Sequence, residues 1–165
     1  MLKPESDSRT ITDKTGRTLI LGCCSKHEIG GLVEMYDAFQ PKAITQGLPP
    51  MESGARRAWI EHLLDHGQNF QALHGSKVIG HSCLITTLGE ANGEYVIFVH
   101  HEYRNSGVGT ELTILTLKRA HDLCVKEIWL TVEALNFRAI KLYRKVGFQF
   151  CDCGERERTM MLRLS

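Results

Sequence analysis

The sequence predicts an α/β (α+β) protein with a mixed, mainly antiparallel sheet of about seven strands flanked by helices. Short apolar runs typical of strands follow one another between Asn69 and Val99, with turn-forming residues between them. From Gly107 onward, helical patterns alternate with strand patterns. The chain has 165 residues, a length suited to one domain with its own core.

The N-terminal residues predict little structure. Met1 to about Gly16 are mostly polar and offer too little apolar area to offset the entropy of ordering. We therefore expect a flexible tail over residues 1–16 and a single domain over residues 17–165.

The first part of this domain predicts a strand, two helices and a loop between them. The strand is the apolar run over residues 18–24. Ser25 and Glu28 follow as a capping box, which satisfies free amides at a helix N-terminus. The prolines and glycine of residues 40–50 predict a loop after this helix, and a second helix should occupy residues 53–65.

The remaining elements follow from apolar runs separated by turn residues. Gly75 and Ser76 suit a tight hairpin turn, and Asn136 is a suitable N-cap for a helix. We expect strands over residues 69–74, 77–88, 94–99, 125–132, 148–153 and 159–164, and helices over residues 107–123 and 136–146.

Composition argues against several classes of protein. The 20 Lys and Arg residues balance 19 Asp and Glu residues, and aromatic residues make up 7%, which disfavours a nucleic-acid-binding protein. No apolar run approaches the ~20 residues that span a bilayer, and the N-terminus lacks the apolar core of a secretion signal. We expect a cytoplasmic protein without membrane contact. The cysteines form no CxxC pair, and His100 and His101 lack an identifiable third ligand, so we expect no metal.

The strongest local signal is the loop over residues 104–110, between an apolar strand and a long helical pattern. Gly107 and Gly109 let the backbone approach a ligand, and the helix N-terminus then presents amides and a positive dipole to an anion. Arg104 could add a charge-assisted bond. A Rossmann fingerprint needs a glycine where Leu112 stands, and a P-loop needs Gly-Lys-Ser/Thr. The loop therefore predicts a different phosphate-binding site, with a simple glycine turn as the alternative.

Two motifs resemble those of the GNAT acetyltransferase superfamily. Its Gln/Arg-x-x-Gly-x-Gly/Ala motif matches Arg104, Gly107 and Gly109. Its Asn-x-x-Ala-x-x-Leu-Tyr-x-x-x-Gly-Phe motif is matched by Asn136, Ala139, Leu142, Tyr143, Gly147 and Phe148. The chain departs from the family where His100-His101-Glu102 replaces a frequent proline before the loop. The resemblance implies a GNAT fold and an N-acetyltransferase that uses acetyl-CoA as cosubstrate.

The resemblance also implies where acetyl-CoA binds. Backbone groups of Ile97, Phe98 and Val99 would bond to its pantetheine arm, and Asn136 would lie near its thiol end with Tyr143. The pyrophosphate would be held by the loop residues Arg104, Asn105, Ser106, Gly107, Val108, Gly109 and Thr110.

Acetyl transfer to an amine requires a base, because a lysine-type amine has a pKa of about 10.4. The resemblance favours Glu94, which opens the strand leading to the loop, with Glu133 second and His100 or water as further candidates. Tyr143 is the candidate acid for the departing thiolate, by analogy with the family tyrosine. Direct transfer in a ternary complex is expected, and a covalent route through a cysteine is the chemical alternative.

The sequence leaves the acceptor open. We expect a protein lysine or N-terminus, because the position of Glu94 resembles that of the base in protein-lysine acetyltransferases. One alternative is a small amine such as a polyamine, amino acid or aminoglycoside, bound by residues 29–39 and 41–60. Another is a non-catalytic acetyl-CoA sensor. A homodimer is an expectation by analogy alone.

Overall fold

The computed structural model describes residues 8–40, 48–87, 89–152 and 154–165. Their strands are β1 (Arg9–Thr12), β2 (Thr18–Cys23), β3 (Gly67–His74), β4 (Lys77–Thr86), β5 (Asn92–Val99), β6 (Glu127–Glu133), β7 (Gln149–Phe150) and β8 (Glu157–Arg163). Their helices are α1 (Ile29–Ala38), α2 (Ser53–His66), α3 (Val108–Asp122) and α4 (Phe137–Val146), with the 3-10 turns η1 (Lys26–Glu28) and η2 (His101–Tyr103). None of these helices is long and apolar enough to cross a bilayer.

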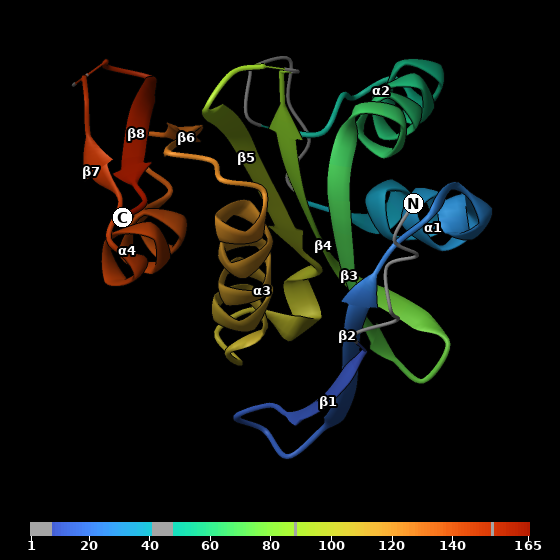
Figure 1. Cartoon of the computed structure of the whole chain (residues 1–165). Helices are drawn as coiled ribbons and strands as arrows, with labels where there is room; N and C mark the ends of the chain where they lie inside the picture. Colours follow the sequence, from blue (N-terminus) through green and yellow to red (C-terminus); the bar gives the residue numbers. More distant parts are fainter. Residues whose placement is uncertain (1–7, 41–47, 88, 153) are drawn as a thin grey trace.

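The described strands form one sheet in the order β1-β2-β3-β4-β5-β6-β8-β7 (Figure 1). Neighbouring strands are antiparallel, except that β5 and β6 run parallel. This confirms the predicted mixed, mainly antiparallel sheet. The described sheet has eight strands rather than about seven, because β1 was not predicted.

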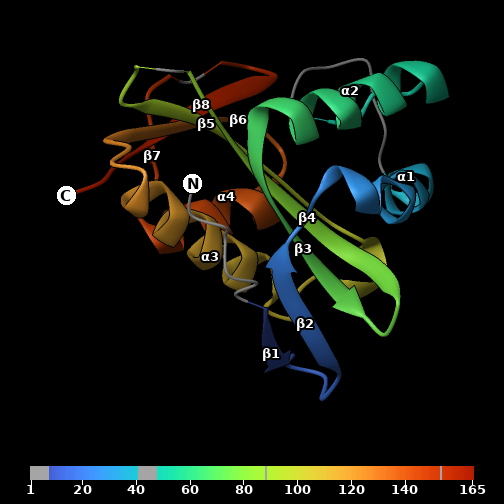
Figure 2. The same ribbon diagram turned by 45° about the vertical axis from the view of Figure 1, so that its right-hand side comes forward.

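Helices cover both faces of the sheet (Figure 2). Alternate side chains along a strand point to opposite faces, so each face has its own core. On one face, Leu112 of α3 packs with Leu19 and Ile79, and α4 extends this layer. On the other face, Tyr36 of α1 and Trp59 of α2 pack against Phe98 of β5.

The N-terminal segment is more ordered than its composition predicted. Residues 9–12 were expected within a flexible tail, but they form β1, which pairs with β2 from Arg9↔Leu21 to Thr12↔Thr18. Arg9 also forms an ion pair with Glu111 of α3. The expectation was wrong for this segment because the ladder with β2 and the ion pair between Arg9 and Glu111 hold it. Residues 1–7 lie outside the described part of the chain, as do residues 41–47 of the predicted loop, Leu88 and Cys153.

The parallel ladder between β5 and β6 is short. It contains the pairs Asn92↔Glu127, Gly93↔Ile128 and Glu94↔Trp129. Beyond it, β5 remains paired with β4 as far as Val99, while β6 remains paired with β8 as far as Glu133. The two strands therefore separate toward their C-terminal ends, as Figure 1 shows.

Candidate active site

A cavity of about 650 Å³ opens where β5 and β6 separate. This volume lies within the range of about 300–1,000 Å³ that is typical of ligand sites. Its walls come from the ends of both strands, the loop before α3 and one face of α4. The lining residues are Lys14, Phe39, Leu48, Ile97, Phe98, Val99, Tyr103, Arg104, Asn105, Gly107, Gly109, Thr110, Thr131, Val132, Glu133, Leu135, Asn136, Arg138, Ala139, Lys141, Leu142, Tyr143 and Lys145.

The loop before α3 has the backbone conformation that an anion site requires. Asn105 and Gly107 both have positive φ, at 56° and 95°, on either side of Ser106. Buried Ser106 donates its hydroxyl hydrogen bond to the Tyr103 carbonyl, which fixes the turn from within. Gly107 is the N-cap of α3 and supplies no capping side chain, so the amides of the first helical turn are available to a ligand.

Arg104 lines the cavity but is engaged with backbone carbonyls. Its Nε donates to the Val99 carbonyl at 3.2 Å, and another guanidinium nitrogen donates to the Gln40 carbonyl. The guanidinium also lies 5.0 Å from the centroid of the Phe39 ring. Burial, together with the charge of Arg138, lowers the pKa of Arg104. This side chain therefore joins the end of α1 to the exit of β5, a structural role that the sequence did not predict.

Positive charge dominates the described wall of the cavity. The lining cations are Lys14, Arg104, Arg138, Lys141 and Lys145, and Glu133 is the lining carboxylate. Three of these cations lie on α4 at spacings of three and four residues, which places them on one face of the helix. The site is thus suited to an anionic ligand although the whole chain has a formal charge of only +1.

Tyr143 and Glu133 reach this cavity, whereas Glu94 lies beside it. Tyr143 is buried, packs edge-on against Phe148, and has its pKa raised well above the usual range by burial. Glu94 forms the last residue pair of the β5–β6 ladder. Burial raises the pKa of Glu94, and His62 of α2 offsets part of this effect. His100 precedes η2 and is not one of the lining residues, although its ring lies 5.9 Å from that of the lining residue Tyr103, and its Nδ1 accepts from the Glu102 amide.

Most residues predicted for ligand binding line the cavity. These are Ile97, Phe98, Val99, Arg104, Asn105, Gly107, Gly109, Thr110, Asn136 and Tyr143. Ser106 and Val108 are instead buried, Ser106 against the Tyr103 carbonyl and Val108 in the core under α3. Asn136 also caps α4, since its side chain accepts from the Ala139 amide at 3.2 Å.

Sequence reasoning missed two parts of this wall. Arg138, Lys141 and Lys145 were not selected, although their helical spacing next to Asn136 was visible in the sequence. No sequence pattern marked Lys14. It lies in the segment that was expected to be a flexible tail, and the fold of that segment brings it to the cavity.

Buried cysteines are poorly suited to a covalent route. Burial raises the pKa of the Cys83 thiol to about 12, so the nucleophilic thiolate is scarce near neutral pH. Within the described ranges, no group of three or more His, Cys, Asp or Glu side chains is arranged to hold a metal ion.

Comparison with known proteins places these features in context. The model of the Acetyltransferase (GNAT) family matches residues 32–148. The chain is 33% identical over 89 residues to a mycothiol acetyltransferase of Pseudarthrobacter chlorophenolicus, which covers 54% of the chain and 27% of that protein. It is 31% identical over 105 residues to an N-alpha-acetyltransferase of Sulfolobus acidocaldarius, which covers 55% of the chain and 62% of that protein. The matches therefore span about a quarter of the first relative and less than two thirds of the second.

Solved structures share the fold. The GNAT domain of S. lividans PAT superposes with a TM-score of 0.81 at 13% identity, over 95% of this chain and 97% of that one. The yncA acetyltransferase of Salmonella typhimurium, solved with its cofactor acetyl-CoA, superposes with a TM-score of 0.72 at 17% identity, over 89% and 94%. At these identities the likeness concerns the fold alone.

Proposed function

This chain belongs to the GNAT acetyltransferase family, and we propose that it transfers the acetyl group of acetyl-CoA directly to a primary amine in a ternary complex. The observation that carries the proposal is the cavity between β5 and β6, which combines a phosphate-type loop with a basic wall. A bound acetyl-CoA supplies a thioester, whose acyl carbon accepts an amine while the thiolate departs.

The residues of the cavity fit acetyl-CoA in shape and charge. The left-handed backbone at Asn105 and Gly107 and the free N-terminus of α3 suit the pyrophosphate. Next to this loop, β5 has no ladder with β6 beyond Glu94, so its backbone groups can bond to the amides of the pantetheine arm as an added strand would. Both features support the proposed cofactor.

The position and burial of two residues support the acid and base roles that we propose. We assign Tyr143 as the general acid, because it lines the cavity and its phenol is protonated near neutral pH, so it can donate to the departing thiolate. We assign Glu94 as the base, because its raised pKa increases its affinity for the proton that an amine must lose. Glu133, which lines the cavity, is the second candidate for the base.

For the acceptor we propose a protein amine, either a lysine side chain or an N-terminus. The similarity to an N-alpha-acetyltransferase supports an N-terminus. The similarity to mycothiol acetyltransferases supports the alternative, a small amine. A non-catalytic acetyl-CoA sensor is the third candidate, since a cofactor cavity by itself supports binding of acetyl-CoA but not turnover.

Thermal unfolding with and without acetyl-CoA tests the cofactor site. A ligand at 100 times its dissociation constant stabilises the folded state by about 2.7 kcal/mol, which raises Tm. Gly107→Glu should abolish the shift by placing a carboxylate at the pyrophosphate. Gly89→Glu is the matched control, because Gly89 also has positive φ, 82°, with open space around it, but lies in the turn between β4 and β5, at the other end of β5 from the loop. Equal shifts in wild type and Gly107→Glu would contradict the site.

An amine panel then separates the candidate functions. We would measure release of free coenzyme A thiol with a lysine-free peptide, an N-terminally blocked lysine peptide, a polyamine, an amino acid and an aminoglycoside. Turnover confined to peptides supports a protein acceptor, and turnover confined to small amines contradicts it. Cofactor binding without turnover on the panel would support the sensor.

A further inference from the structure

We propose that Lys14, at the tip of the turn between β1 and β2, is a further ligand for the diphosphate of coenzyme A, and that Asp13 positions it. The inference rests on the proposed function. It adds to the cavity a residue that lies outside both sequence motifs and about 90 residues before the phosphate loop.

Lys14 lies directly against the loop that begins α3. Its amide donates to the Ser106 carbonyl at 2.9 Å, which joins the two turns through the backbone. Its side chain runs beside Gly107, where a Cβ would lie 3.8 Å from the Lys14 Cε. Lys14 also lines the cavity. Its ammonium group can therefore approach an anion bound to the amides that follow Gly107.

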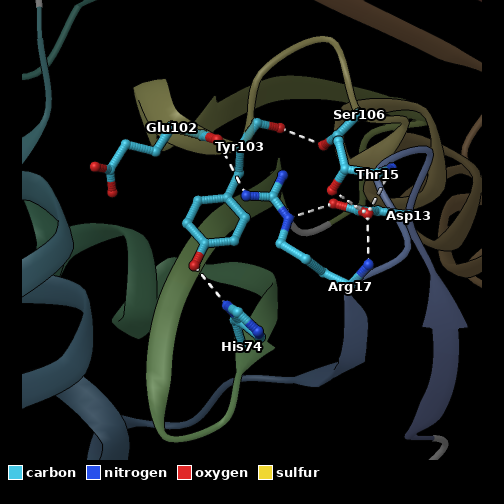
Figure 3. Close-up of polar contacts among 7 residues, drawn as sticks. All are labelled: Asp13, Thr15, Arg17, His74, Glu102, Tyr103 and Ser106. Carbon is cyan, nitrogen blue, oxygen red and sulfur yellow. Dashed lines mark hydrogen bonds and ion pairs between the residues drawn. The ribbon is translucent and has the colours of Figure 1, made fainter.

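Asp13 holds the turn in one conformation (Figure 3). One carboxylate oxygen accepts from the Thr15 amide at 2.9 Å, the Thr15 hydroxyl at 2.8 Å and the Arg17 amide at 2.9 Å. The other accepts from Arg17 Nε at 2.8 Å. Burial alone would raise the pKa of Asp13, but the bonds from Thr15 and Arg17 outweigh it and hold the pKa well below its usual range. A fixed turn limits the entropy that Lys14 loses when it binds an anion.

Arg17 and Tyr103 attach this turn to the cavity wall, as Figure 3 shows. The Arg17 guanidinium lies 4.1 Å from the centroid of the Tyr103 ring and donates to the Glu102 carbonyl at 3.2 Å. The Tyr103 hydroxyl in turn bonds to His74 Nδ1 at 2.6 Å. Ser106 is bonded to the Tyr103 carbonyl, so the turn and the phosphate loop share one support.

The charge of Lys14 has a distinct place in the site. Arg104 donates to the carbonyls of Val99 and Gln40, and the other lining cations, Arg138, Lys141 and Lys145, belong to α4. The Lys14 backbone amide bonds to Ser106 and the Lys14 side chain runs beside Gly107, where the first free amides of α3 begin. Its position therefore suits an anion bound to those amides, where we place the diphosphate of coenzyme A.

Calorimetric dissociation constants for coenzyme A and dephospho-coenzyme A test this assignment, because the second ligand retains the diphosphate and lacks the 3′-phosphate. Lys14→Met should weaken binding of both ligands by a similar factor, about fivefold for a partly exposed charged contact. Lys14→Arg should restore most of the affinity. Added salt should reduce the difference in dissociation constant between wild type and Lys14→Met, because it screens the charge of Lys14. Lys126→Met, which removes an exposed lysine from the α3–β6 connection, is the matched control and should bind as wild type.

Three outcomes would overturn the inference. Unchanged affinity in Lys14→Met would show that Lys14 does not bind the ligand. Weaker binding of coenzyme A alone would show that Lys14 binds the 3′-phosphate. Failure of wild type to bind either ligand would contradict the proposed function as well. Binding by wild type therefore separates an error about Lys14 from an error about the function.

A double-mutant cycle tests the positioning role of Asp13. Asp13→Asn should weaken binding in the wild-type background and have no further effect on binding in the Lys14→Met background, because it acts through Lys14. An equal additional loss in both backgrounds would show that Asp13 is merely structural.

Discussion

Glu94 and Tyr143 belong to opposite faces of the sheet. Glu94, Val96 and Phe98 are every second residue of β5 and so share one face of the sheet. Val96 and Phe98 pack toward α1 and α2 on that face. Tyr143 packs with Phe148 in the core under α3 and α4. An acceptor amine that entered from the α1–α2 face would therefore meet the proposed base before it reached the proposed cofactor cavity. This arrangement fits the separate roles of base and acid that we propose for Glu94 and Tyr143.

We expect Glu94→Gln to lower kcat by about 10²-fold or more, the usual contribution of a general base. Because burial raises the pKa of Glu94, wild-type kcat/KM should fall as the pH decreases through that raised pKa and the base becomes protonated. The variant has no carboxylate to protonate, so this acidic limb should disappear. The measurement is a pH profile of kcat/KM with the best amine of the panel.

Two further variants sharpen the assignment of Glu94. Glu133→Gln should retain the acidic limb, since Glu133 is not the assigned base. Tyr143→Phe should lower kcat and also retain the acidic limb, because it removes the proposed acid and leaves the proposed base. A limb that persists in Glu94→Gln and vanishes in Glu133→Gln would transfer the role to Glu133.

Single residues of the site were predictable where a motif marks them. Gly107, Gly109, Asn136 and Tyr143 could be placed because their spacing matches local backbone requirements and a family pattern. Lys14 could not be placed, because it depends on pairing between strands and on the contact with Ser106.

Element boundaries show the same division between local and distant causes. The capping box of Ser25 and Glu28 and the N-cap of Asn136 were predicted and are confirmed, because both depend on residues within one turn. In contrast, β1 has one partly buried apolar residue, Ile11, and exists through its pairing with β2. Of the strand expected over residues 148–153, the structure has β7 at Gln149–Phe150; Phe148 lies in the core just before it, and Cys153 is outside the described residues.

Asn136 connects element stability with the site. Asn136→Ala should lower the free energy of unfolding by about 1 kcal/mol, because the Ala139 amide loses its acceptor at the start of α4. Urea unfolding measures this loss. Asn136→Ser keeps a capping oxygen and should restore most of the stability.

The affinity for acetyl-CoA separates the two roles of Asn136. If Asn136 only caps the helix, Asn136→Ser should bind acetyl-CoA as wild type does. If it also contacts the cofactor, affinity should fall in the serine variant while stability is preserved. Equal stability losses in the alanine and serine variants would contradict the capping role.

At the scale of the whole molecule, a buried polar chain connects the α1–α2 layer to the sheet. Asn69 Nδ2 donates to the Leu63 carbonyl at 2.8 Å and the Gly67 carbonyl at 2.9 Å, so its Oδ1 faces His81. His81 Nε2 must then donate to Asn69, and His81 Nδ1 accepts from the Tyr36 hydroxyl at 2.7 Å. His81 is fully buried as a neutral ring, and burial lowers its pKa to about 3.

This histidine should make global stability depend on pH. Above pH 6.5, His81 is neutral in both folded and unfolded chains, so it contributes no pH dependence there. Between pH 6.5 and about 3, the unfolded chain binds a proton that the folded chain excludes, which costs roughly 1.4 kcal/mol per pH unit. Urea unfolding should therefore show wild type losing about 2 kcal/mol more than His81→Gln between pH 7 and pH 5. Exposed His121→Gln is the control and should follow wild type, whereas parallel pH profiles for wild type and His81→Gln would show that His81 is protonated in the folded protein.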